Sequence, residues 1–98
     1  MTYRNDPIDQ ELEALTRLSG GFAGKRVLEV GCGNGRITRK YADQAAYIDA
    51  IDPNETEIKT ALEMQPDGES HVQYHELALE DFQASEPYDL VILAWSLC

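Results

Sequence analysis

The chain has 98 residues, of which 43% are apolar and 27% charged, values typical of one small globular domain. Eighteen acidic against eight basic residues give a formal net charge of -10, which repels phosphate backbones and anionic membranes, so we expect neither nucleic acid nor membrane as a partner. No segment approaches the roughly 18 apolar residues of a membrane span, and the N-terminus lacks a signal-peptide layout. A cytoplasmic location is expected.

The first predicted elements are a helix and a strand. Asp6-Pro7 has the pattern of an N-cap followed by proline in the first turn, and apolar residues then recur at helical spacing as far as Leu18. Gly20-Gly21 ends this helix. The short apolar run Arg26–Val30 follows, and its length and β-branched residues favour a buried strand.

A second helix and a second strand come next. Asn34 is positioned to cap the helix, and Tyr47–Asp52 predicts the strand. One face of the helix carries the apolar residues Ile37, Tyr41 and Ala45.

Pro53-Asn54 then opens a third helix, with Glu57 placed like the second half of a capping box. Its buried stripe is expected to contain Ile58, Ala61 and Leu62.

The last third of the chain predicts two further strands. Val72–His75 is the weaker one, Leu79–Gln83 has room for one helical turn, and Tyr88–Ala94 contains the four apolar residues Leu90–Leu93. Strands that alternate with helices indicate successive βαβ units, which place a parallel sheet between helices. A ligand of such a sheet binds at the carboxyl ends of the strands.

The unusual residues lie where the first strand ends. Gly31, Gly33 and Gly35 follow this strand directly, and glycines allow a backbone to turn sharply and approach a ligand closely. A plain turn is the alternative interpretation. Asp52 favours the ligand, because it stands 21 residues after Gly31 at the end of the second strand, where a carboxylate can accept hydrogen bonds from ribose hydroxyls.

The spacing of the loop separates two classes of ribose-containing cofactor. A dinucleotide fingerprint would place its third glycine at position 36, where this chain has Arg36. Glu29, two residues before Gly31, would repel a pyrophosphate but suits a cofactor with a cationic amino-acid end.

These motifs resemble those of the class I S-adenosylmethionine-dependent methyltransferases. Glu29–Gly35 is similar to the first motif of that family, Ile48–Pro53 to its second strand, Ala78–Phe82 to its third motif and Tyr88–Leu93 to its fourth strand. The resemblance implies an α/β fold with a Rossmann-like parallel sheet of about four strands in the order 3-2-1-4. Residues 1–98 would form a domain that lacks the C-terminal strands of the seven-stranded family fold.

The resemblance also implies a function and a set of binding residues. The cofactor would be S-adenosylmethionine, the product S-adenosylhomocysteine, and the reaction methyl transfer to an unidentified acceptor. No catalytic residue is assigned. The residues expected to bind the cofactor are Glu29, Gly31, Cys32 and Gly33 at the methionine end, Asp52 at the ribose, Pro53, Leu79 and Glu80 at the adenine, and Ala94 and Trp95 below the sulfonium. Trp95 can equally cap the apolar edge of the sheet.

Two other functions remain open. One is a non-catalytic cofactor-binding subunit that needs a partner to complete its site, and the other is an NAD-dependent oxidoreductase domain. We expect the isolated chain to be inactive, because family members build the acceptor pocket from segments after the fourth strand. The apolar fourth strand has nothing after it to cover its edge, so we also expect a homodimer through this edge.

No metal or disulfide is expected. His71 and His75 lie four residues apart, a separation of about 13 Å in a strand, so they cannot share one ion. Cys32 and Cys98 are too few and too distant for a disulfide scaffold or a metal site.

Overall fold

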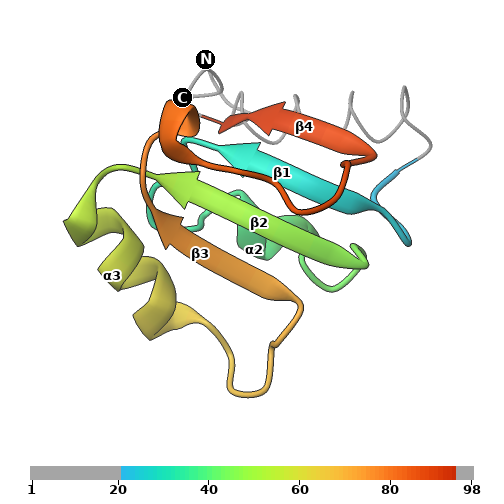
Figure 1. The fold of residues 1–98 in the computed structure, drawn as a ribbon. Helices are drawn as coiled ribbons and strands as arrows, with labels where there is room; N and C mark the ends of the chain where they lie inside the picture. The colour runs from blue at the N-terminus through green and yellow to red at the C-terminus, as the bar shows by residue number, and fades with distance from the viewer. Residues whose placement is uncertain (1–20, 95–98) are drawn as a thin grey trace, which may run out of the picture.

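The computed structural model describes residues 21–94, which form a four-stranded parallel sheet with helices on one side (Figure 1). The strands are β1 (Arg26–Val30), β2 (Tyr47–Asp52), β3 (Val72–Glu76) and β4 (Leu90–Leu93). Their order is β3-β2-β1-β4, so the predicted fold class and strand order are confirmed. The predicted helix before Gly20 and the predicted contact of Trp95 lie outside the described residues.

The register brings the carboxyl ends of the four strands to the same end of the sheet. Val30 of β1 pairs with Ile51 of β2 on one side and with Leu93 of β4 on the other. Asp52 of β2 pairs in turn with Glu76 of β3. The loops after β1, β2 and β3 therefore start at the same end of the sheet, where β4 also ends.

The helix after β1 is shorter than predicted. Helix α2 spans Thr38–Tyr41, and among the described residues no side chain caps its N-terminus. The Asn34 side chain instead accepts a hydrogen bond from the Arg36 amide at 3.1 Å, which closes a local turn. The expected cap at Asn34 is wrong because this turn uses the same side-chain oxygen.

Helix α3 spans Glu55–Met64 and has the predicted cap, since the Asn54 side chain accepts a hydrogen bond from the Glu57 amide at 3.0 Å. Ile58 and Ala61 are buried as expected. Leu62 is 52% exposed, which corrects its assignment to the buried stripe. The reciprocal half of the capping box is also wrong, because the Asn54 amide donates to Asp52 Oδ1 at 2.8 Å rather than to Glu57.

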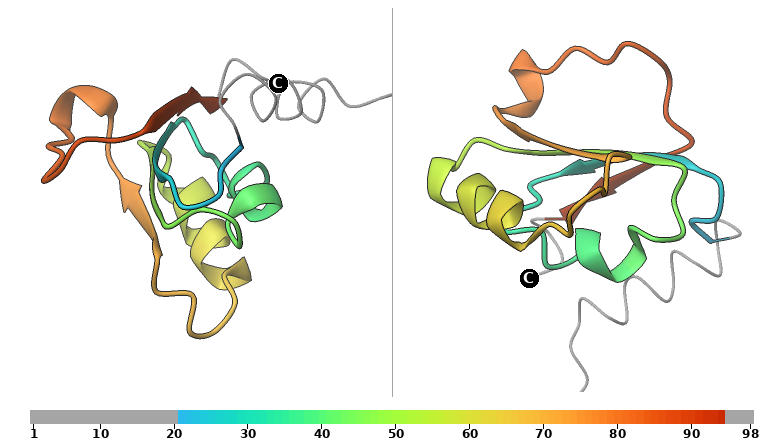
Figure 2. Two further views of the ribbon diagram at one scale, coloured as in Figure 1. Left: turned by 90° about the vertical axis from the view of Figure 1, so that its right-hand side faces the viewer. Right: turned by 90° about the horizontal axis from the view of Figure 1, so that it is seen from below.

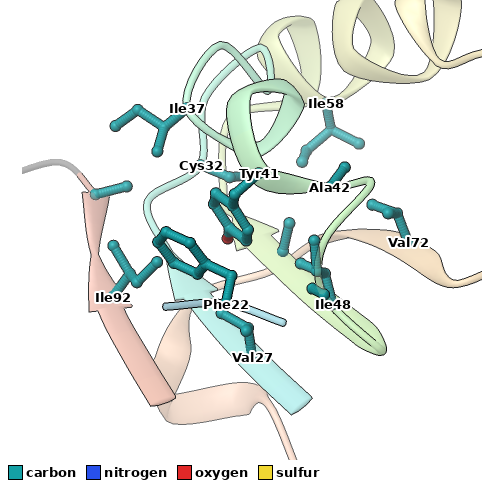
Figure 3. Packing of buried hydrophobic residues seen from close by; sticks show 13 residues of the cluster. Phe22, Val27, Cys32, Ile37, Tyr41, Ala42, Ile48, Ile58, Val72 and Ile92 are labelled. Atoms are coloured by element: carbon teal, nitrogen blue, oxygen red, sulfur yellow. The ribbon is translucent and has the colours of Figure 1, made fainter. Parts of the chain in front are cut away.

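Apolar packing fixes the two helices against one face of the sheet (Figure 3). The Phe22 and Tyr41 rings stack with centroids 4.3 Å apart, above Val27 of β1. Full burial of each such side chain contributes about 1.5–3 kcal/mol. The apolar face predicted for this part of the chain is buried, because Ile37, Tyr41 and Ala45 are each at most 8% exposed.

The opposite face of the sheet carries the segment between β3 and β4 (Figure 2, right). This segment, residues 77–89, contains a single 3-10 turn at Leu79–Asp81, close to the predicted helical turn. A smaller apolar cluster of Leu28, Val30 and Ile51 lies beneath it.

Candidate functional site

The loop after β1 folds over the end of β2. The amides of Gly31 and Cys32 both donate to the Ile51 carbonyl, at 2.8 and 3.0 Å. Gly33 and Gly35 have φ angles of 55° and 84°, which glycine adopts without a Cβ penalty. A Cβ on Gly35 would also lie 2.8 Å from the Tyr74 hydroxyl oxygen, so the loop has both conformational and spatial reasons for glycine there.

Asp52 connects this loop to helix α3. Its Oδ2 accepts a hydrogen bond from the Gly33 amide at 2.9 Å, and its Oδ1 accepts one from the Asn54 amide at 2.8 Å. Each carboxylate oxygen can accept more than one hydrogen bond. Asp52 is therefore held in place by backbone groups and retains capacity to bind ligand hydroxyls.

Two clefts meet at Gly31, at the carboxyl ends of the strands. The first has a volume of about 440 Å³, within the range of small-molecule sites. It is lined by Val30, Gly31, Ile51, Asp52, Pro53, Leu77, Ala78, Leu79 and Glu80. The second, of about 200 Å³, is lined by Gly31, Cys32, Gly33, Asn34, Arg36, Ile37, Glu57 and Ala94.

The clefts bring together most of the predicted binding residues. Gly31, Asp52, Pro53, Leu79 and Glu80 line the first cleft, with Gly31 shared between the two. Cys32, Gly33 and Ala94 line the second cleft, and Trp95 lies outside the described residues.

Glu29 does not line either of these clefts. It is fully buried on the side of β1 that faces α2, where its Oε1 accepts hydrogen bonds from Thr38 Oγ1 at 2.9 Å and Tyr41 Oη at 2.6 Å. Burial raises the pKa of this carboxyl to about 7, although the bonds from Tyr41 and Thr38 partly oppose the rise. Within the described residues Oε2 has no hydrogen-bond partner. Glu29 thus ties β1 to α2 beneath the glycine loop.

Cys32 is a buried thiol next to several carboxylates. Burial raises its pKa well above the ordinary value, and the negative charges of Glu29 and Asp52 raise it further. A thiol that stays protonated is a poor nucleophile, so Cys32 fills space in the loop.

Sequence reasoning missed Glu57 and Arg36 as cleft residues. A Cβ on Gly33 would lie 2.9 Å from Glu57 Oε2, so this carboxylate stands directly over the loop. It is available there because Asp52, and not Glu57, accepts the Asn54 amide. The capping-box spacing placed Glu57 in the first turn of α3 but gave no sign that its side chain reaches the loop.

Two further features concern the described part of the chain. Its helices are all too short or too polar to cross a membrane. Among residues 21–94, His, Cys, Asp and Glu side chains do not gather in a group of three or more that could hold a metal ion.

Comparisons with known proteins agree with this geometry. A protein-family model described as a methyltransferase domain matches residues 27–98. A ubiquinone biosynthesis O-methyltransferase of Leptothrix cholodnii is 37% identical over 83 residues, which cover 82% of this chain and 35% of the relative. The corresponding protein of Pasteurella multocida is 30% identical over 71 residues, covering 72% of this chain and 29% of the relative.

A solved structure supports the same comparison. The N-methyltransferase NodS from Bradyrhizobium japonicum WM9, in complex with S-adenosyl-L-homocysteine, superposes with a TM-score of 0.70 at 29% identity, covering 89% of this chain and 45% of NodS. The chain thus spans about a third of the length of its curated relatives and under half of NodS.

Proposed function

The chain belongs to the class I S-adenosylmethionine-dependent methyltransferase family, and we propose that it forms the cofactor-binding part of a methyltransferase. The single observation that carries the proposal is the junction at Gly31. There the glycine loop, the carboxylate of Asp52 and two clefts meet at the carboxyl ends of β1 and β2.

The first cleft suits the adenosine part of the cofactor. In our proposal Asp52 accepts hydrogen bonds from the ribose hydroxyls, while Pro53 and Leu79 pack against the adenine and Glu80 borders its edge. The predominance of apolar residues in this cleft supports the assignment, because an aromatic base gains by leaving water.

The second cleft suits the methionine part. It contains one basic and one acidic side chain, Arg36 and Glu57, beside the glycine loop. A zwitterionic amino-acid end needs one charge of each sign, and the sulfonium adds a positive charge that acidic neighbours favour. We place this end between Gly31, Cys32, Gly33 and Ala94.

A bound S-adenosylmethionine supplies an already activated methyl group. The residues of this chain then bind and orient the cofactor, and positioning provides most of the rate enhancement. Because the similar proteins include both O- and N-methyltransferases, the proposal concerns the cofactor side and not the acceptor. We further propose a cytoplasmic location and a domain whose acceptor side is completed by residues outside the described part of the chain or by a partner.

Calorimetric titration tests the proposed function. S-adenosylmethionine and S-adenosylhomocysteine are expected to bind the 98-residue chain, and NAD is expected not to bind, because Arg36 stands where a dinucleotide fingerprint needs its third glycine. Binding of NAD without any response to the sulfonium compound or its product would favour an oxidoreductase domain. Methyl transfer by the isolated chain would contradict the expected need for an additional acceptor side.

The outer edge of β4 supports a further proposal, self-association. Val91 and Leu93 on this strand are 52% and 47% exposed, and among the described strands β4 pairs with β1 alone. An exposed apolar edge strand is a template for pairing with another chain. We propose a homodimer through this edge, in which a second copy completes the sheet. Light scattering is expected to give twice the monomer mass, and a monomer at high concentration would contradict the proposal.

A further inference from the structure

A cluster of polar side chains lies on the sheet face opposite α2 and α3. Its centre is Asp49 of β2, which is 5% exposed. Asp49 Oδ1 accepts hydrogen bonds from Tyr47 Oη at 3.0 Å and from His75 Nε2 at 2.8 Å, and Oδ2 accepts one from Tyr88 Oη. Three donors from three parts of the chain therefore converge on one buried carboxylate.

Arg26 forms an ion pair with this carboxylate. Its guanidinium lies 3.8 Å from Asp49 Oδ2, with the Tyr47 and Tyr88 rings centred 4.3 and 5.1 Å from it. Burial alone would raise the pKa of Asp49, but the hydrogen bonds from Tyr88, His75 and Tyr47 outweigh burial and lower it. Hydrogen bonds to an ionised acceptor are stronger than those between neutral groups.

Two of the three donors stand at opposite ends of the connection between β3 and β4. His75 lies in β3, just before this connection begins, and Tyr88 lies just before β4. Between them, residues Leu77–Glu80 form one wall of the first cleft. The third donor, Tyr47, belongs to β2 and is not attached to the connection.

The backbone bonds of residues 77–82, the part of the connection that borders the cleft, are local. The amides of Leu77, Asp81 and Phe82 donate to carbonyls two or three residues earlier, which fixes the shape of the turn but not its place on the sheet. At the β4 end the Asp89 amide donates to the Arg26 carbonyl and Asp89 Oδ2 accepts from the Arg26 amide, both at 2.8 Å. The part of the connection that borders the cleft is placed by side chains, namely the bonds to Asp49 and the packing of Leu77, Phe82 and Tyr88 on the apolar cluster below.

We propose that Asp49 is a positioning residue for the cofactor cleft: by holding His75 and Tyr88, it sets where the wall Leu77–Glu80 stands. This inference rests on the proposed function only in identifying the ligand as S-adenosylhomocysteine. Ile51, two residues after Asp49 on the same face of β2, also lines the cleft, so the carboxylate and the cleft share one strand.

Single hydroxyl deletions test the proposal. In Tyr88→Phe, loss of one hydrogen bond to a charged group is expected to weaken S-adenosylhomocysteine binding about tenfold, as measured by calorimetry. Tyr47→Phe removes a bond to the same carboxylate without releasing the connection, and it is expected to change the affinity less than about twofold. His75→Leu is expected to behave like Tyr88→Phe, and His75→Gln, which retains a donor, to restore part of the affinity.

Equal losses of affinity in Tyr88→Phe and Tyr47→Phe would overturn the proposal, because Asp49 would then act through general stability alone. Thermal unfolding of each variant establishes that it is folded at the titration temperature. Unchanged affinity in both Tyr88→Phe and His75→Leu would also overturn it.

Hydrogen exchange in the ligand-free protein separates this inference from the proposed function. The amides of Asp81 and Phe82 are expected to exchange faster in Tyr88→Phe and His75→Leu than in wild type and Tyr47→Phe, because the turn that holds them is released. If wild type binds no S-adenosylhomocysteine, the proposed function fails and this exchange pattern still decides the role of Asp49. Identical exchange in all four proteins would overturn it.

Discussion

Replacement of Asp52 by alanine is expected to weaken S-adenosylhomocysteine binding by about a hundredfold. Two charge-assisted hydrogen bonds to ribose hydroxyls together contribute about 3 kcal/mol, which corresponds to roughly that factor. The variant also releases the Gly33 amide, which Asp52 Oδ2 holds at 2.9 Å, so the loop loses an anchor as well. Calorimetry with the ligand measures the change directly.

Asp52→Asn and Glu55→Gln distinguish the loss of hydrogen bonds to the ligand from the loss of one negative charge. Asn retains one side-chain carbonyl oxygen and is expected to lose about tenfold, the equivalent of one charge-assisted bond. Glu55→Gln changes the net charge by the same amount as Asp52→Ala at an exposed position in the first turn of α3, and it is expected to bind as wild type does. Wild-type affinity in Asp52→Ala would show that the ribose assignment is wrong.

The strands were predictable because a parallel strand covered on both faces leaves a short, nearly continuous apolar run in the sequence. The predicted Arg26–Val30 and Tyr47–Asp52 agree with β1 and β2 at both ends. Strand β4 is shorter than the predicted Tyr88–Ala94 at both ends. At its start Tyr88 donates a hydrogen bond to Asp49 instead of continuing the ladder, and at its end Ala94 lies outside the strand.

Helix α2 was harder to predict because its start depends on loop geometry. Gly35 has a φ of 84°, and the Arg39 amide donates to the Gly35 carbonyl at 2.9 Å, so the chain completes a turn before regular helix begins at Thr38. Apolar periodicity found the buried face correctly, because turns of this kind preserve the spacing of Ile37 and Tyr41.

The parts of the candidate site that form a motif in the sequence were predictable. The parts that are assembled from separate strands were not. The glycine loop and Asp52 are recognisable from spacing alone. The cluster around Asp49 is different, because Arg26, His75 and Tyr88 come from other strands or connections and meet it only once the sheet has formed. Sequence patterns do not reveal contacts between side chains that lie far apart in the chain.

Glu29 is a third case. The sequence predicted its place in the first motif, but it did not predict that the side chain is buried toward α2. In a strand, successive side chains point to opposite faces, so Glu29 shares the face of Val27 and points toward α2. Apolar residues on both faces of β1 hid this alternation. The result is a carboxyl under the loop whose pKa burial raises to about 7.

This buried carboxyl is expected to make the stability of the protein depend on pH. In the unfolded chain Glu29 has the ordinary pKa of 4.5, and in the native state about 7, so the native state binds the proton more tightly. Its contribution is fully present below pH 4.5 and is lost as the pH rises through about 7. At about 1.4 kcal/mol per pKa unit, the loss amounts to about 3 kcal/mol.

Comparison with Glu29→Gln isolates this contribution, because an amide of similar size does not ionise and other titrating groups cancel in the difference. Urea unfolding at pH 4.5 and pH 8 is expected to show wild type losing about 3 kcal/mol relative to Glu29→Gln between the two conditions. Glu63→Gln makes the same chemical change at an exposed position of α3 and is expected to follow wild type at both pH values. A constant difference between wild type and Glu29→Gln would mean that Glu29 titrates alike in both states, and that water or a counter-charge reaches the carboxylate beneath the glycine loop.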